Sequence, residues 1–205
     1  WFHAVSIGEF KSILPVIKEL NKKYYNIEFL ITSSTLSSGN LITEIIRDHK
    51  NVHHRFLPVD VGFLVKKFLI RWKPDVIFLV DSEIWPNIII NARNLNIPLA
   101  LINGRITNKT FKKWKLIPTT AKNIFSSFVL CLSSNFETKD YLIELGANNV
   151  ISVGNLKFIN QENLSKSSDP NERFLQEVNF WFAVSTHKEE EKFCLETHLL
   201  LKKKK

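Results

Sequence analysis

The sequence contains no methionine, only two cysteines, and no apolar run near the roughly 18 residues that a membrane-spanning helix requires. Cys131 and Cys194 lie in apolar surroundings without zinc-ligand spacing, so we expect no disulfide framework and a reducing compartment. The histidines show no ligand spacing either, and we predict no metal site. Neither GxGxxG nor GxxxxGK[ST] occurs, which argues against a dinucleotide-dependent enzyme and a P-loop nucleotidase.

Both ends of the sequence look unlike domain edges. Residue 1 falls inside an apolar stretch, and the helical pattern of 198–205 stops in four lysines. We therefore expect a fragment, truncated at both ends. The formal net charge is +8, and without those lysines it is +4, too small an excess to indicate a nucleic-acid partner.

The other basic residues cluster with Phe and Trp in two segments, Val65–Lys73 and Asn108–Lys115. Such a mixture suits an anionic lipid surface. It equally suits two helices whose cations are solvated and whose aromatic rings pack in the core. The composition leaves both interpretations open.

Short apolar runs rich in β-branched and aromatic residues alternate with amphipathic patterns, which predicts an α/β fold with a parallel sheet. The expected strands are 1–6, 27–34, 52–58, 75–82, 98–105, 128–134 and 150–155. The expected helices are 10–20, 39–49, 61–72, 85–96 and 136–146, the last ending at Gly146 as a C-cap.

The polar sequence QENLSKSSDPNE near 160–170 predicts a linker. We expect a first domain at 1–159, a linker at 160–179, and the start of a second domain at 180–205. The second part contains one apolar run, 179–187, and one helical pattern, 188–201. These predict the first strand and first helix of a truncated domain.

The carboxyl ends of parallel strands meet at one edge, where open α/β sheets bind their ligands. Charged residues follow several expected strands, namely Glu9, Asp60, Asp81, Glu83, Arg105 and Lys157. Two carboxylate sites, an arginine and a lysine on one edge are typical of a site for an anionic substrate.

Several of these residues also have an ordinary structural interpretation. Glu9 could act as a general base, or it could only complement the dipole at a helix N-terminus. Asp81 or Glu83 could cap the helix that begins near Pro86. Lys157 could stabilise transition-state charge, or it could be a surface lysine.

In the second part, Ser185 and Thr186 are N-cap candidates, and the backbone N–H groups beside them could receive an anion. His187 follows them directly. On its own, a histidine at this position is more often structural.

Seven segments in order carry a resemblance to a known family: HAVSIGE, TSSTLSSG, LPVD, DSEIWPN, INGR, GNLKF and STHKEEE. The chain resembles the 3-deoxy-D-manno-octulosonic acid (Kdo) transferases of lipopolysaccharide synthesis over nearly its whole length. The resemblance implies a GT-B glycosyltransferase with two Rossmann-like domains, of which 1–159 would bind the acceptor.

The resemblance implies an inverting transfer of Kdo from CMP-Kdo to a lipid A precursor, without a cofactor, at the cytoplasmic face of the bacterial inner membrane. It assigns the base to Glu9 and stabilising roles to Asp81 and Lys157. Glu83, Arg105, Ser185, Thr186 and His187 would contact substrate.

The chain departs from the family pattern at three places. Asp81 replaces a glutamate that is one methylene longer, TLSSG replaces TPTG, and Glu189 replaces a glycine. Most of the donor-binding domain is also absent, so the resemblance leaves a second possibility open. The chain could be a non-catalytic remnant that at most binds anionic lipid.

Overall fold

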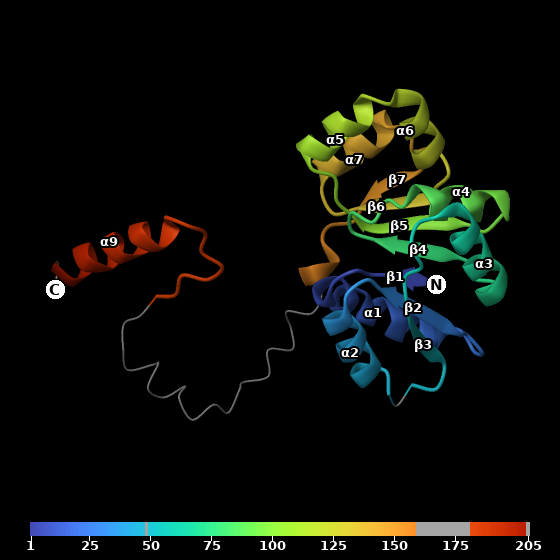
Figure 1. Ribbon diagram of the computed structural model, residues 1–205, viewed down its shortest axis with the longest axis horizontal. Coiled ribbons are helices and arrows are strands. Elements are labelled where there is room, and N and C mark those ends of the chain that lie inside the picture. The colour runs from blue at the N-terminus through green and yellow to red at the C-terminus, as the bar shows by residue number, and fades with distance from the viewer. Residues whose placement is uncertain (48, 159–180, 204–205) are drawn as a thin grey trace. The chain divides into compact units, whose positions relative to one another are not determined.

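A parallel β-sheet lies at the centre of the first part of the chain (Figure 1). The computed structural model describes residues 1–47, 49–158 and 181–203. Within them, the sheet has seven strands in the order β3-β2-β1-β4-β5-β6-β7. The strands are β1 (Phe2–His3), β2 (Phe29–Ser33), β3 (Val52–Phe56), β4 (Ile77–Val80), β5 (Leu99–Gly104), β6 (Leu130–Ser133) and β7 (Val150–Ser152). The predicted α/β class and all seven predicted strands are confirmed.

Helices follow the strands and return the chain to the amino edge of the sheet. They are α1 (Ile7–Lys23), α2 (Leu36–Ile45), α3 (Gly62–Trp72), α4 (Pro86–Asn94), α5 (Asn108–Lys115), α6 (Pro118–Phe125) and α7 (Phe136–Glu144). The five predicted helices are confirmed as α1, α2, α3, α4 and α7. Helix α6 was not predicted. Only two residues separate it from the end of α5, and Pro118 occupies its first turn.

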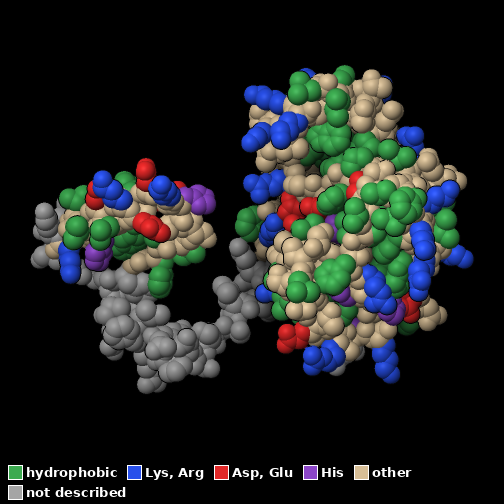
Figure 2. All heavy atoms as spheres, viewed as in Figure 1, with side chains coloured by type: hydrophobic (Ala, Val, Ile, Leu, Met, Phe, Trp, Pro, Cys, Tyr) green, Lys and Arg blue, Asp and Glu red, His purple; other side chains and the backbone are tan. Residues whose placement is uncertain are grey.

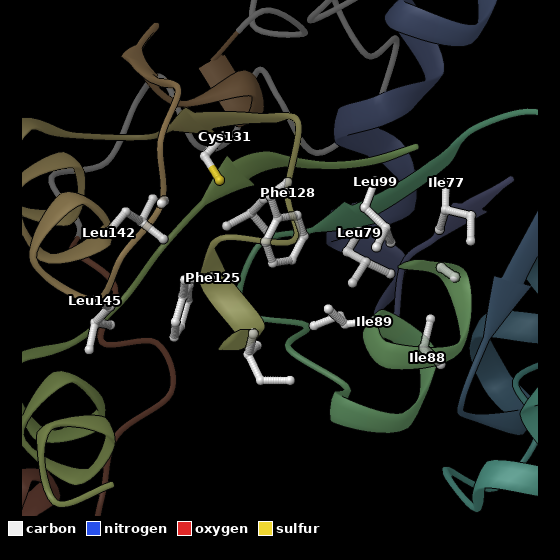
Figure 3. Packing of buried hydrophobic residues seen from close by; sticks show 14 of the residues in the cluster. Ile77, Leu79, Ile88, Ile89, Leu99, Phe125, Phe128, Cys131, Leu142 and Leu145 are labelled. Atoms are coloured by element: carbon white, nitrogen blue, oxygen red, sulfur yellow. The ribbon is translucent and has the colours of Figure 1, made fainter. Parts of the chain in front are cut away.

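Neighbouring residues of a strand point to opposite faces, and the core therefore divides into two clusters. Leu79 of β4 and Leu101 of β5 pack in one cluster with α3, α4, α6 and α7, as Figure 3 shows in part. Val80 and Ile102 pack in the other, with α1 and α2. Burial on both faces explains why these strands read as continuous apolar runs in the sequence.

Gly146 ends α7 as predicted. Its φ is +108°, its N–H donates to the carbonyl of Ile143 at 3.0 Å, and the N–H of Ala147 donates to that of Leu142 at 2.9 Å. These two bonds form a Schellman motif, which needs a left-handed residue at this position. A Cβ at Gly146 would also lie 3.1 Å from Cα of Lys122, a backbone atom of α6.

Gly146→Ala is expected to destabilise the chain by about 1–2 kcal/mol, because alanine adds left-handed strain and a close backbone contact. Chemical denaturation of both proteins measures the difference. Gly8→Ala is the matched control, since Gly8 lies in α1 and its added Cβ would meet nothing closer than 3.9 Å. Equal midpoints for Gly146→Ala and the parent would contradict the prediction.

The chain divides into two units, Trp1–Glu162 and Asn163–Lys205. The predicted linker, 160–179, lies outside the described residues. In the second unit the predicted helix is confirmed as α9 (Glu190–Lys203). The strand predicted at 179–187 was wrong for the residues that the structure describes, 181–187, which form no strand. A strand needs a hydrogen-bonded neighbour, and apolar composition alone does not supply one.

Candidate active site

The topology of the sheet changes direction between β1 and β4. These strands pair in parallel, with Phe2 opposite Phe78 and His3 opposite Leu79. After β1 the chain passes through α1 to β2 on one side, and after β4 it passes through α4 to β5 on the other. Open α/β sheets commonly bind their ligands at such a switch point, and the segments after β1 and β4 lie at this carboxyl edge.

Glu9 lies in the first turn of α1, three residues after the N-cap Ser6. Its Oε2 accepts the Val5 N–H at 2.8 Å, its Oε1 accepts the Ser6 hydroxyl at 3.1 Å, and its own N–H donates to Ser6 Oγ at 3.2 Å. This arrangement resembles a capping box, with the N–H of Val5 in place of that of the N-cap Ser6. These bonds give Glu9 a structural role at the start of α1, and they hold its carboxylate, partly exposed, just beyond β1.

Asp81 follows β4 and forms an ion pair with Lys157, which follows β7. Lys157 Nζ donates to Asp81 Oδ2 at 2.8 Å, and the two residues are 76 positions apart in sequence. The Asp81 side chain is 10% exposed, whereas that of Lys157 is 41% exposed. The sheet thus brings together two of the three predicted catalytic residues, with the lysine on the solvent side.

The backbone of Asp81 is strained. Its φ is +63°, in the left-handed region that residues other than glycine rarely occupy. Its N–H donates to the carbonyl of Ile102 at 3.0 Å, and its carbonyl accepts the N–H of Arg105 at 3.2 Å. These bonds to β5 and the residue after it fix the conformation.

Asn103 holds the loop that carries Lys157. It lies in β5, is nearly fully buried, and accepts the N–H of Leu156 through Oδ1 at 2.9 Å. Asn155 fixes the next peptide, because its Oδ1 accepts the N–H of Lys157 at 3.0 Å. This link between INGR and GNLKF could not be predicted, since Leu156 lies 53 positions after Asn103.

Glu83 lies in the loop between β4 and α4. Its Oε2 accepts the indole N–H of Trp85 at 2.6 Å and lies 3.5 Å from Nε2 of His3. The side chain of Glu83 is 17% exposed and that of His3 is fully buried. Glu83 therefore lies at the carboxyl edge beside β1, as its position in the sequence predicted.

The helix cap predicted for Asp81 or Glu83 comes instead from Asp60, after β3. Asp60 Oδ1 accepts the N–H of Ile88 at 3.1 Å, and Oδ2 accepts that of Asn87 at 3.2 Å. The prediction that Asp81 or Glu83 caps α4 was wrong for both residues, because the loop after β3 brings the carboxylate of Asp60 to the start of α4. Asp81 and Glu83 are thereby left for other contacts.

Arg105 follows β5 and its side chain is exposed. Its backbone is held in place, because its carbonyl accepts the Ser82 hydroxyl at 2.8 Å. The guanidinium lies on the same edge of the sheet as Asp81. Figure 2 shows Asp and Glu side chains gathered close to Lys and Arg side chains on this unit.

In the second unit, α9 begins at Glu190, so Ser185 and Thr186 do not directly precede it, and the N-cap prediction for them was wrong. The carboxylate of Glu190 accepts the N–H of His187 at 2.7 Å, and that N–H is therefore already occupied. Glu189, which stands where the resembled family has glycine, has a φ of +80°. A left-handed conformation at this position favours glycine.

Other features of the described residues do not compete with this edge as a catalytic site. A cavity of about 660 Å³ lies at the opposite, amino edge, lined by Trp1, Phe29 and Val76 among others. Burial raises the pKa of Cys131 to about 12, which makes it a poor nucleophile. No cluster of three potential metal ligands and no helix able to cross a bilayer is found in the part of the chain that the structure covers.

Comparison with known proteins gives a consistent result. The family model described as 3-deoxy-D-manno-octulosonic-acid transferase (kdotransferase) matches residues 1–160. The 3-deoxy-D-manno-octulosonic acid transferase of Rickettsia felis is 36% identical over 95% of the chain, and that of Haemophilus influenzae is 25% identical over 98%. The chain spans 42% and 48% of these two relatives, less than half of each.

Among solved structures, the UDP-GlcNAc 2-epimerase from Neisseria meningitidis matches 76% of the chain, with a TM-score of 0.53 and 14% identity. The match covers 46% of that protein. At this identity the likeness concerns the fold alone. It agrees with the doubly wound strand order of the sheet.

Proposed function

Because the chain belongs to the Kdo transferase family, we propose that it forms the acceptor-binding half of a glycosyltransferase that moves Kdo from CMP-Kdo to a lipid A precursor. The observation that carries this proposal is the Asp81–Lys157 ion pair at the switch-point edge, with Glu9 at the end of the adjacent central strand. A base and a cation on one edge suit attack by a hydroxyl on an anionic donor.

In the proposed reaction, the carboxylate of Glu9 takes the proton of the acceptor hydroxyl. The hydroxyl oxygen bonds to the anomeric carbon of Kdo while the bond from that carbon to the CMP phosphate breaks. Attack opposite the leaving group inverts the configuration, and CMP departs with the bonding electrons. No cofactor takes part, and the donor is consumed as a substrate.

Lys157 is proposed to offset negative charge that develops as the donor departs. The ion pair with Asp81 fixes Nζ before substrate arrives, so that less reorganisation is needed in the transition state. Asp81 therefore acts through Lys157. The side chain of Asp81, one methylene shorter than glutamate, reaches Lys157 at 2.8 Å.

Donor and acceptor must be held together for this reaction, and the curated relatives are more than twice as long as this chain. We propose that the donor contacts come from the part of the family that the chain does not span. Ser185, Thr186, His187 and Arg105 remain proposed substrate contacts.

The test uses two proteins, the chain itself and a chimera in which the carboxyl-terminal half of the Rickettsia felis relative follows it. Each is incubated with CMP-Kdo and lipid A precursor, and mass spectrometry measures Kdo addition. The chimera is expected to transfer Kdo. If it transfers none while the full-length Rickettsia felis protein does in parallel, the proposed function is contradicted.

We also propose that α3 rests on an anionic lipid surface, which places the enzyme at the cytoplasmic face of the bacterial inner membrane. Phe63 is 71% exposed and Ile70 is 52% exposed, beside Lys66 and Lys67. In α5, by contrast, Phe111 and Trp114 pack against the core. The aromatic residues thus favour the core interpretation for α5 and leave apolar surface on α3 for a membrane.

Replacing Lys66 and Lys67 with alanine is expected to weaken binding to phosphatidylserine-containing vesicles roughly 30-fold, since each cation contributes about 1 kcal/mol. Vesicle co-sedimentation at low salt measures the effect. Lys18 and Lys22, replaced together on α1, are the control with the same charge change. Equal losses in both double variants would mean that α3 has no special role.

A further inference from the structure

A chain of polar groups runs behind the candidate site, from Trp1 through Thr32 and His3 toward Glu83. The indole N–H of Trp1 donates to Thr32 Oγ1 at 2.8 Å, and Nδ1 of His3 lies 2.9 Å from the same oxygen. Thr32 lies in β2, and both it and His3 are fully buried. His3 therefore cannot meet substrate, and any role it has must act through a neighbour.

The chemical groups fix the direction of the hydrogen bond between Trp1 and Thr32. An indole nitrogen only donates, so Thr32 Oγ1 accepts from Trp1, and the hydroxyl is left with one hydrogen to give. Nδ1 of His3 is within reach of that hydrogen. The carbonyl of Thr32, 3.2 Å from Nδ1, already accepts the N–H of Ala4 at 3.0 Å. Each Thr32 oxygen keeps a second lone pair, so these contacts allow Nδ1 to accept or to donate. The carboxylate of Glu83, 3.5 Å from Nε2, favours the tautomer of neutral His3 with its ring hydrogen on Nε2 and Nδ1 as the acceptor.

Nε2 is buried and makes no hydrogen bond among the described residues. Its nearest charged neighbour there is Oε2 of Glu83, at 3.5 Å. Buried polar groups are almost always paired, so an unpaired donor facing a carboxylate calls for an explanation. The same Oε2 accepts the Trp85 indole N–H at 2.6 Å. Two N–H groups thus converge on one oxygen of Glu83.

We propose that His3 is a positioning residue, an inference that rests on the proposed function. Together with Trp85, His3 holds Oε2 of Glu83. Oε1 of Glu83 is then left to accept hydrogen bonds from hydroxyls of the acceptor sugar. Oε1 makes no hydrogen bond within the described part of the chain. When a sugar binds, Nε2 of His3 and Oε2 of Glu83, now 3.5 Å apart, move within hydrogen-bonding distance. Nε2 then has a hydrogen-bond partner, and the carboxylate is held in place. Thr32 and Trp1 serve this arrangement by supporting this tautomer of His3.

The first test needs no enzymatic activity. In ¹⁵N-labelled 205-residue chain near pH 8, long-range ¹H–¹⁵N spectra are expected to show His3 with Nδ1 unprotonated and Nε2 protonated. Thr32→Val keeps the side-chain shape but removes the hydroxyl, and it should redistribute the two tautomers. Thr32→Ser should preserve the Nε2–H form. A protonated Nδ1 in the parent chain would overturn the inference and leave the proposed function untouched.

The second test measures acceptor recognition by titrating the chain with lipid A precursor. His3→Leu is expected to weaken binding about tenfold, the usual loss for one hydrogen bond to a charged group. His3→Gln can place an N–H near the Nε2 position and should restore most of it. Thr32→Val should also weaken binding, without changing the buried ring. Thermal midpoints are recorded for every variant.

These outcomes separate the two hypotheses. Equal affinity for the parent, His3→Leu and Glu83→Gln would overturn the positioning role. The positioning role would also be overturned if His3→Leu weakened binding of lipid A precursor and His3→Gln did not restore it, because the loss would then come from packing alone. A parent chain that binds no lipid A precursor contradicts the proposed function, and the tautomer spectra still decide the state of His3.

Discussion

Replacing Glu9 with glutamine is expected to lower Kdo transfer by the chimera about 10²–10⁴-fold, the usual contribution of a general base. Glutamine at this position can still complete the capping box with Ser6 and Val5, so the start of α1 should remain folded. The variant thus removes basicity and keeps the cap. Mass-spectrometric rates of Kdo addition at saturating substrate give the comparison.

Glu19→Gln is the matched control, because Glu19 lies on the same helix and is exposed. It should transfer Kdo at the parent rate. Lipid A precursor should bind Glu9→Gln as it binds the parent chain. Parent-like turnover in Glu9→Gln would remove Glu9 from the mechanism and leave it with only its capping role.

Asp81→Asn is expected to reduce transfer about 10²–10³-fold, comparable with loss of one preorganised electrostatic contact in other enzymes. Asparagine tolerates the left-handed region, so the φ of +63° can be retained while the charge is lost. Lys157 then loses its ion partner and its fixed position. Rates in the chimera and its unfolding midpoint are measured together.

Lys157→Met should cost a similar factor, and the double variant should be little worse than either single variant, because the two residues act as a unit. Asp75→Asn, at the opposite end of the same strand, provides the control. Multiplicative losses in the double variant would show that Asp81 and Lys157 act independently.

Much of the fold could be predicted because its signals are local. Runs such as 75–82 and 98–105 are apolar on both faces, which is typical of buried parallel strands. The convergence of Asp81 and Lys157 follows from the same pattern, since residues after parallel strands share an edge. Their direct pairing was not predictable, because it depends on how the loop after β7 folds back.

Other features depend on contacts that leave no local pattern. Asp60 caps a helix 27 residues away, and the buried position of His3 becomes meaningful only when β1, β2 and β4 are side by side. The strand expected at 179–187 failed among its described residues for the related reason that pairing cannot be read from one segment. Local composition predicts elements, and side-chain partners require the assembled sheet.

The buried amide of Asn103 bears on how mutants of this family would be interpreted genetically. An inactivating substitution of Asn103 invites the conclusion that its side chain touches the sugar. Since Asn103 anchors the backbone beside Lys157, such an allele would instead imitate the phenotype of a damaged lysine. Suppressor changes should then arise in GNLKF, more than fifty positions downstream.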